Sequence, residues 1–509
     1  MKYNILLGNL PGSLDYFVST GGSGGGAHAV MLAATSANPV FYDYERDCGA
    51  AGIYRNSDGS FFNSANIFGD EVTITDGIWG CMAYSPITSL AEADMAMAFE
   101  YWLDPDYEFS TPFQNKTAER LALEYVDYIN ELGLTVSEGD IGVDLSNDGD
   151  FEDSVQLGIE YDDEEGFSGS YLDLYLATFE RSLDGYLGNL GYAEGWTWFG
   201  NDGNPLTDEE VKAMTDSDRA LAFIEGRYSK GSSGGRGGRP DGGFPEAMSG
   251  AERPEGMDGP PEGGRPEAGT PKPGTTQAGG SAVDSAEFAS FDEMLAAYQE
   301  DIASIEAGDK YGNNIVDLYD PMTFIGAEGT ENPAWVRMLM GASEGDISMF
   351  NSLNLECAFL QAGTHAEAVW QWDGGHVPGE ILGDSFTLYV DRMYGLYAED
   401  AAEITKPAAE PAASNGTAEE ADGTDISGWV SYDPKAGASF SLEDAAAYRT
   451  AGASKAIPGF DVIDYGQEDY VFGNSEKDAR HWNYRLLDVF EQYMEELAPL
   501  FRGAQPQED

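Results

Sequence analysis

The sequence predicts an α/β fold built on a mostly parallel sheet. Short apolar segments typical of buried strands alternate with segments of helical periodicity, first before residue 110 and again between residues 283 and 400. Near the N-terminus one such strand runs through a glycine-rich turn directly into a helix. The 509 residues are 42% hydrophobic and 12% aromatic, so we expect most of the chain to fold.

The predicted elements follow one another as strand and helix. The near-continuous apolar segment Ile78–Tyr84, followed by Ser85-Pro86, fits a strand buried on both faces. Trp335–Met340 and Ala366–Trp372 are predicted as further strands, joined by a helix around Leu353–Leu360. The other predicted helices cover Gly26–Ser36, Leu90–Tyr101, Ala118–Leu132, Phe291–Ile305, Ile381–Tyr394 and Trp482–Phe501, the last with an apolar face of Leu486, Val489, Phe490, Tyr493 and Leu497.

Two segments have a composition that cannot form a core. Residues 231–280 contain sixteen glycines and eight prolines, one aromatic residue and no Val, Ile or Leu. Residues 405–424 are rich in Ala, Glu and Pro. Such segments bury too little apolar surface to offset the entropy of ordering, so we expect both to be disordered linkers.

The charge and the cysteines exclude several classes of function. A formal net charge of -65 argues against nucleic acid or an anionic membrane as partner. Cys48, Cys81 and Cys357 are far apart, so the spacing indicates neither a disulfide framework nor a zinc site, and we expect buried free thiols. No apolar run is long enough for a membrane span, and no secretory signal is visible.

One acidic segment matches a calcium-binding loop only in part. Asp144–Asp150 begins like an EF-hand loop, but Val155 occupies the position of the bidentate Glu. A solvated acidic hairpin is favoured, and we predict no metal and no cofactor.

The glycine-rich turn is the most informative motif. The predicted strand Tyr16–Thr20 leads into Gly21-Gly22-Ser23-Gly24-Gly25, which matches Gly-x-Ser-x-Gly. At a strand-to-helix turn this pattern exposes a nucleophilic serine above the sheet of an α/β-hydrolase. Glycines allow the strand and helix to approach, and the helix N-terminus, with the Gly24 N–H, would favour an oxyanion beside Ser23.

Two other interpretations fit the same residues. Gly22–Ala27 also satisfies the dinucleotide-binding fingerprint, with Asp43 at the distance of a ribose-binding acid, which would make the protein a Rossmann-type oxidoreductase. The third interpretation is a glycine turn without chemistry.

The four histidines test the hydrolase interpretation. His28 lies one turn into the helix after Ser23 and points away from a site at the strand end. His365 occupies a polar turn, and His481 opens the C-terminal helix. His376 follows a predicted strand in Gly374-Gly375-His376, where an α/β-hydrolase keeps its base, so we select His376.

The loop after the preceding strand supplies the acid. Glu344 and Asp346 lie there, and either carboxylate could accept the Nδ1–H of His376. Ser23, an acid and His376 then follow in the chain order of α/β-hydrolases, each at the carboxyl end of a predicted strand. This order favours the hydrolase over the dinucleotide interpretation.

With these residues, the chain resembles the bacterial tannase and feruloyl-esterase group of α/β-hydrolases. The resemblance lies in Tyr3-Asn4 through Ala27, in Tyr84–Thr88 with the following Ala93–Ala96 and Glu100–Trp102, and in Trp335 through His376. It implies that Ser23 is the nucleophile and His376 the base. The family's Asp-x-Asp falls on Glu344-Gly345-Asp346, of which the first acid orients the histidine and the second binds hydroxyls of the acyl group.

The resemblance implies the substrate and compartment as well. Esters of hydroxylated aromatic acids are the expected small-molecule substrate, with Trp372, like Trp370, available to stack on the ring and Asp346 to accept phenolic hydrogen bonds. The full-length protein is expected to be secreted or held in the cell envelope.

The chain departs from the family in two ways. Few residues precede the strand before Ser23, so the first strands and one oxyanion donor are not visible, and the chain looks N-terminally truncated. A segment from Phe460 to His481 that resembles the family's lid follows the catalytic histidine instead of preceding it. An inactive or truncated fragment is therefore an alternative.

The predicted organisation is an α/β-hydrolase-like core with a helical lid insertion and long disordered linkers. Its parts are the nucleophile part of the core (1–110), a lid or insertion (111–230), a linker (231–282), the acid and histidine part of the core (283–400), a second linker (401–424) and a lid-like helical C-terminal segment (425–509).

Overall fold

The computed structural model describes most of the chain outside the predicted linkers. The described residues are 1–50, 52–57, 61–109, 111–162, 166–189, 196–214, 218, 222, 225–229, 288–342, 344–345, 347–372, 374–378, 386–398, 441–452 and 484–501. The predicted linkers 231–282 and 401–424, Asp346 and the Phe460–His481 segment lie outside them.

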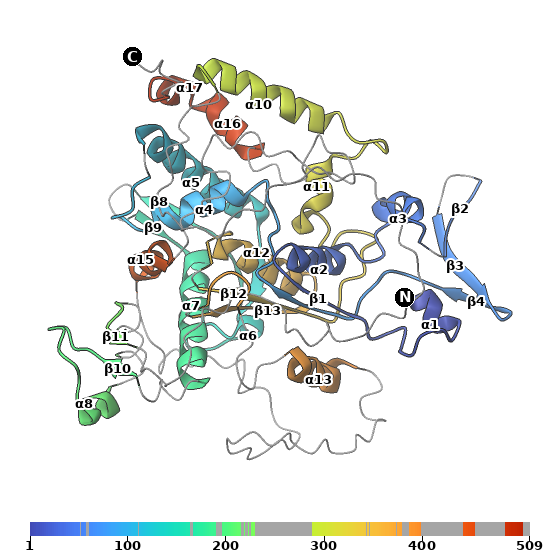
Figure 1. The fold of residues 1–509 in the computed structure, drawn as a ribbon, viewed down its shortest axis with the longest axis horizontal. Helices are drawn as coiled ribbons and strands as arrows, with labels where there is room; N and C mark the ends of the chain where they lie inside the picture. Colours follow the sequence, from blue (N-terminus) through green and yellow to red (C-terminus); the bar gives the residue numbers. More distant parts are fainter. Residues whose placement is uncertain are drawn as a thin grey trace, which may run out of the picture.

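A parallel sheet occupies the centre of the molecule (Figure 1). Among the described residues it has four strands in the order β1 (Val18–Gly22), β5 (Gly80–Tyr84), β12 (Trp335–Gly341) and β13 (His365–Gln371). All three pairings are parallel. The protein is therefore an α/β fold with a parallel sheet, as predicted, and the carboxyl ends of the four strands meet at one edge.

The two faces of this sheet carry different partners. Cys81, Ala83, Val336 and Met338 pack against helices α2 (Gly24–Thr35) and α12 (Met349–Gln361). The alternate residues Met82, Trp335 and Leu339 pack against α13 (Phe386–Tyr397) on the other face. Because side chains alternate along a strand, the consecutive apolar residues of β5 and of β12, where Arg337 is the charged exception, require cover on both faces.

The largest apolar cluster lies beside the sheet, among helices. It joins α4 (Ala93–Trp102), α5 (Pro112–Leu132), α7 (Ser170–Asn189) and α10 (Phe291–Glu306) to the C-terminal α16 (Tyr484–Gln492). The remaining elements are α1 (Lys2–Leu6), the 3-10 turn Pro39–Phe41, α3 (Tyr42–Asp47), β2 (Ile53–Arg55), β3 (Phe61–Ile67), β4 (Asp70–Thr73), β6 (Thr135–Ser137), α6 (Glu138–Ile141), β7 (Ser154–Gln156), β8 (Glu160–Asp162), β9 (Gly166–Ser168), β10 (Thr197–Trp198), α8 (Asp208–Ala213), β11 (Tyr228–Ser229), α11 (Ile315–Tyr319), the 3-10 turn Pro321–Thr323, α15 (Leu442–Gly452) and α17 (Met494–Leu497).

The long helix predicted over Trp482–Phe501 is wrong in one respect: its described part is two helices. It divides at Tyr493, between α16 and α17. The Tyr493 ring lies 4.6 Å from the Arg120 guanidinium and its hydroxyl donates to Glu124, both on α5. These contacts anchor Tyr493 to α5, whereas Leu486, Val489, Phe490 and Leu497 are buried as predicted.

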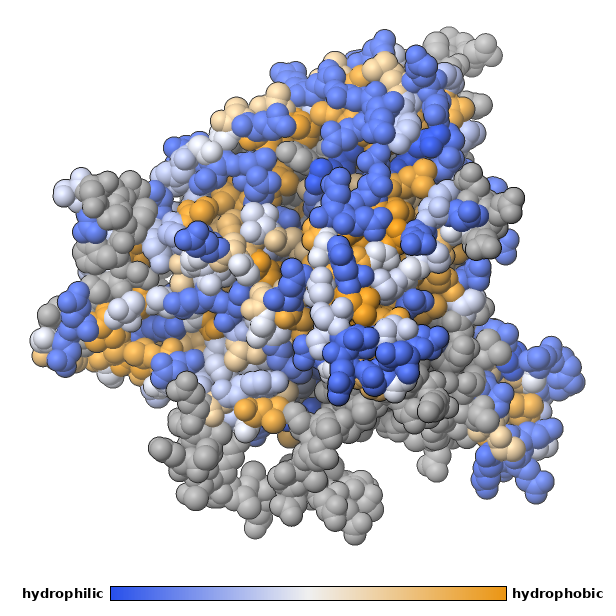
Figure 2. Space-filling model, turned by 180° about the vertical axis from the view of Figure 1, so that it is seen from behind, coloured by the Kyte–Doolittle hydropathy of each residue, from blue (hydrophilic) through white to orange (hydrophobic). Residues whose placement is uncertain are grey.

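The surface mixes hydrophilic and apolar residues, and one of the three cysteines is exposed on it. Hydrophilic residues cover much of the face seen in Figure 2, with apolar side chains exposed between them. Cys81 and Cys357 are buried as predicted, but Cys48 is exposed, because it lies at the end of the short surface helix α3. In the described part of the chain, no helix is both long and apolar enough to cross a membrane.

Candidate active site

Ser23 lies at the sharp turn between β1 and α2. Its backbone has φ 56° and ψ -126°, a conformation that is rare for a residue with a side chain. The Ser23 N–H donates to the Tyr84 carbonyl at 2.9 Å, and its carbonyl accepts from Ala27 at 2.9 Å in the first turn of α2. The strained serine is thus held from both sides, at the carboxyl edge of the sheet.

Glycines around Ser23 permit the close approach of β1, α2 and the neighbouring loops. A Cβ on Gly21 would lie 2.4 Å from the Gly25 carbonyl carbon, and one on Gly26 would lie 2.7 Å from the Tyr84 carbonyl oxygen. A Cβ on Gly22 would meet Val377, the residue after His376, at 2.8 Å. No larger residue fits at these positions without a shift of the backbone or of Val377.

Ser23, His376 and Glu344 form a continuous chain of contacts. His376 Nε2 lies 2.8 Å from Ser23 Oγ, and His376 Nδ1 lies 2.7 Å from Glu344 Oε2. The Glu344 side chain is fully buried, whereas the His376 side chain is 32% exposed. A hydroxyl, an imidazole and a buried carboxylate in this order can move a proton from the hydroxyl to the imidazole.

The loop that carries His376 packs directly on the end of β12. A Cβ on Gly341 would lie 2.2 Å from the Gly375 carbonyl oxygen, so the two loops touch through glycine. Val377 has φ 53°, unusual for a β-branched residue, and its N–H donates to Ser85 Oγ at 3.1 Å. Ser85 is itself buried with φ 41°, and its N–H donates to the Leu339 carbonyl at 2.7 Å.

Ser85 and Val377 are not among the residues that the sequence predicted for the site. Both stand next to recognised features, the end of an apolar strand and the predicted base. Nothing in their residue type shows the contact that joins them across 292 positions.

The other histidines lie away from this edge. His28 is on the exposed surface of α2, and His365 is the first residue of β13, at the opposite end of that strand from His376. His365 was predicted in a turn, and it starts the strand instead. His481 lies outside the described residues.

Trp372 and Gly24 differ in accessibility. Trp372 is fully buried, its indole N–H donates to the Phe179 carbonyl at 3.1 Å, and its ring packs against Phe179 and Tyr448. A substrate-stacking role for Trp372 stays a prediction, and it would need these neighbours to move. Gly24 is exposed at the first position of α2, where its N–H can face a group bound to Ser23.

The arrangement that a dinucleotide site needs is not formed here. Asp43, the ribose-binding candidate, lies in α3, where it pairs with Arg46 at 2.7 Å. The strand beside β1 is β5, whose end carries Ser85 instead of an acid. Since the ribose-binding acid of a Rossmann fold ends the strand next to the first, this interpretation loses its second element.

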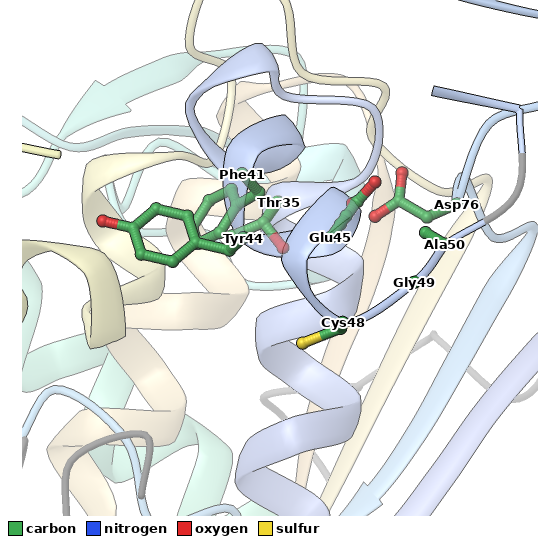
Figure 3. A pocket seen from close by; sticks show the side chains of 8 residues that line it. All are labelled: Thr35, Phe41, Tyr44, Glu45, Cys48, Gly49, Ala50 and Asp76. Carbon is green, nitrogen blue, oxygen red and sulfur yellow. The ribbon is translucent and has the colours of Figure 1, made fainter. Parts of the chain in front are cut away.

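A separate cavity of about 400 Å³ lies at the other end of α2. It is lined by Thr35, Phe41, Tyr44, Glu45, Cys48, Gly49, Ala50 and Asp76 (Figure 3). The Glu45 and Asp76 carboxyls face each other, and burial together with Asp76 raises the pKa of Glu45 to about 7. Thr35 ends α2 and Ser23 precedes it, which at 1.5 Å per residue places this cavity roughly 18 Å from the serine turn.

No metal cluster is found among the residues that the structure describes. In the predicted acidic hairpin, Val155 lies in β7 and pairs with Val136 of β6, while Asp144 accepts backbone N–H bonds from Asp148 and Gly149.

Comparison with known proteins finds distant structural neighbours alone. The chain matches no protein-family model, and no curated protein is similar in sequence. A tannin acyl hydrolase solved with 3,4-dihydroxybenzoate is 18% identical at a TM-score of 0.43, over 77% of this chain and 68% of that one. The native tannin acyl hydrolase from Lactobacillus plantarum is 17% identical at 0.43, over 77% and 69%. The tannase of Fusobacterium nucleatum is 16% identical at 0.41, over 77% and 70%. We therefore take the activity of this chain from its own residues.

Proposed function

We propose that the protein is a serine carboxylesterase that works through an acyl-enzyme on Ser23. The observation that carries this proposal is the contact chain from Ser23 Oγ through His376 to Glu344, at 2.8 and 2.7 Å. The positive φ of Ser23 adds support, because nucleophilic serines of α/β-hydrolases lie on a strained turn between a strand and a helix.

The reaction follows from these positions. Ser23 Oγ attacks the ester carbonyl carbon while its proton passes to His376 Nε2, and the carbonyl oxygen becomes an oxyanion. The Gly24 N–H and the positive end of the α2 dipole lie beside that oxygen. His376 then gives the proton to the leaving alcohol, and a water activated by the same imidazole hydrolyses the acyl-enzyme.

Glu344 is the triad acid in this proposal. Its carboxylate accepts the Nδ1–H of His376, which fixes the tautomer that leaves Nε2 free to take the serine proton. Burial of Glu344 keeps water from competing for that bond. Asp346, two residues on, is proposed to bind substrate hydroxyls.

The proposed substrates are esters of hydroxylated aromatic acids, such as galloyl or hydroxycinnamoyl esters. This step rests on the sequence resemblance around Ser23, Glu344-Gly345-Asp346 and His376. Hydrolysis of methyl gallate and methyl ferulate should exceed that of a plain short acyl ester in kcat/KM. A preference for the plain ester would still support an esterase activity, but it would contradict the proposed specificity for aromatic esters.

The test of the activity is covalent labelling. A fluorophosphonate should modify the protein at Ser23, and Ser23→Ala should lose both labelling and roughly 10⁴-fold or more of kcat. The fold should be retained, since alanine keeps the Cβ that the turn already accommodates. Labelling at another residue, or equal turnover by Ser23→Ala, contradicts the assignment of Ser23. The absence of both labelling and turnover in the unaltered protein favours the inactive-fragment alternative.

A further inference from the structure

Arg449 is a buried charge that connects the C-terminal part of the chain to the acid loop, residues 342–345. It lies on α15, and its side chain, like that of Glu100 on α4, is fully buried. A charge without water must be paired and hydrogen-bonded, because its desolvation is otherwise too costly. The partners of Arg449 therefore show what it holds.

One side of the guanidinium meets Glu100. Arg449 Nε donates to Glu100 Oε1 at 2.8 Å, and Nη2 donates to Oε2 at 3.3 Å. Tyr175 OH on α7 donates to the same Oε1 at 3.2 Å. This fork fixes the plane and direction of the guanidinium.

The other side of the guanidinium meets the acid loop. Arg449 Nη1 donates to the Ala342 carbonyl at 2.8 Å and to the Glu344 carbonyl at 2.5 Å. The loop is also bonded through its own backbone N–H groups, from Ala342 to the Gln371 carbonyl at the end of β13 and from Glu344 to the Gly341 carbonyl. One nitrogen thus spans the loop and bonds the carbonyl of the residue whose carboxylate contacts His376.

We propose that Arg449 is a positioning residue for the triad, which holds the Glu344 backbone so that its carboxylate meets His376 Nδ1. The inference rests on the proposed function and deepens it. Glu100 neutralises and aims the guanidinium, so the catalytic acid depends on α15, 105 residues farther along the chain. Lysine cannot replace arginine here, because one ammonium cannot make the fork to Glu100 and bond two carbonyls.

The experiment compares three variants. Arg449→Met should lower kcat about a hundredfold, the cost of a misplaced catalytic group, with little change in KM. It also leaves the buried Glu100 without its charged partner, with the Tyr175 hydroxyl bond remaining. Arg449→Met/Glu100→Gln should therefore recover most of the lost stability while kcat stays low. Thr450→Val is the matched control, because Thr450 is the next residue on α15. This change removes the 2.6 Å bond from the Thr450 hydroxyl to Asp104 without touching the acid loop, and it should leave kcat unchanged.

The pH dependence separates positioning from folding. Since the Glu344 carboxylate favours protonated His376, its displacement should move the acidic limb of the kcat/KM profile to lower pH in the Arg449 variants and leave it in place in Thr450→Val. A folded double variant with the kcat and pH profile of the unaltered protein overturns the proposal.

An activity-independent measurement keeps this test apart from the esterase assignment. Spectra of ¹⁵N-histidine report the protonation of His376 Nδ1 whether or not an ester is hydrolysed. If the unaltered protein hydrolyses no ester, the esterase proposal fails, while the spectra still test whether Arg449 positions Glu344. If the protein hydrolyses esters but the His376 signals are the same in Arg449→Met, the positioning role of Arg449 alone fails.

Discussion

The serine turn and the acid loop carry two members of the proposed triad, Ser23 and Glu344, and are held in opposite ways. The serine turn is built from adjacent residues: Gly21, Gly25 and Gly26 let β1 and α2 touch around the strained Ser23. The acid loop is held from a distance, by the Arg449 guanidinium of α15 and its partner Glu100 of α4. Close contacts between neighbouring residues therefore surround the proposed nucleophile, whereas buried polar contacts from distant parts of the chain hold the loop of the proposed acid.

The helices that follow the serine turn and the acid loop also differ in the kind of side chain that they bury. α2, behind the serine, contains no acidic residue, and it buries small apolar side chains against the sheet. α12, behind the acid loop, buries Glu356, which lies 3.8 Å from Arg181 of α7. Within the two helices, the stability of α12 should therefore depend more on pH than that of α2, because only α12 buries an acidic side chain.

The largest expected effect is steric, at the serine turn. Gly21→Ala would place a Cβ 2.4 Å from the Gly25 carbonyl carbon, so it should lower the free energy of unfolding by about 3 kcal/mol. Gly25→Ala is the control, since its Cβ meets nothing within 4 Å. In a helix this change should be neutral or stabilise by up to about 1 kcal/mol. Urea unfolding measures both, and equal losses would mean that close approach does not define the turn.

The second effect separates the two helices by pH. Burial raises the pKa of Glu356 to about 7, so the folded protein binds this proton more tightly than the unfolded chain. The resulting stability is present below about pH 4.5 and is lost as the pH rises through 7, by roughly 3 kcal/mol in total. Unfolding at pH 5 and pH 8 should show this loss, with faster hydrogen exchange in α12 than in α2 at the higher pH.

Glu356→Gln is the variant that checks the pH effect. It should flatten the dependence of stability on pH, although not fully, because burial also raises the pKa of Asp94 and Glu92. An unchanged slope between pH 5 and pH 8 would contradict the assignment to Glu356.

The smallest effect concerns the loop that joins the two features. Ser85→Ala removes the acceptor of the Val377 N–H and should lower kcat about tenfold, as expected for roughly 1.4 kcal/mol of lost positioning. Ser89→Ala is matched, because Ser89 is also buried with positive φ, but its hydroxyl bonds Asp320. Steady-state kinetics should show the loss of kcat in Ser85→Ala alone, and equal losses would remove Ser85 from the histidine loop's support.

Much of the candidate site was predictable from the sequence, because its signals are short-range. Near-continuous apolar runs predicted β5 and β12, and the glycines around Ser23 predicted the strand-to-helix turn that β1 and α2 form. The chain order of Ser23, an acid and His376 predicted which strand ends would meet. Hydrophobic periodicity and a missing Cβ are properties of neighbouring residues, so no knowledge of the remaining fold was needed.

Tertiary structure decided the rest, since those contacts join residues far apart in the chain. It brought Glu344 to His376, while Asp346 lies outside the described residues. It also packed Trp372 into the core, paired Ser85 with Val377, and set Arg449 across the acid loop. A buried arginine or serine has no local signature, because its identity is selected by carbonyls and carboxylates that only the folded chain assembles around it.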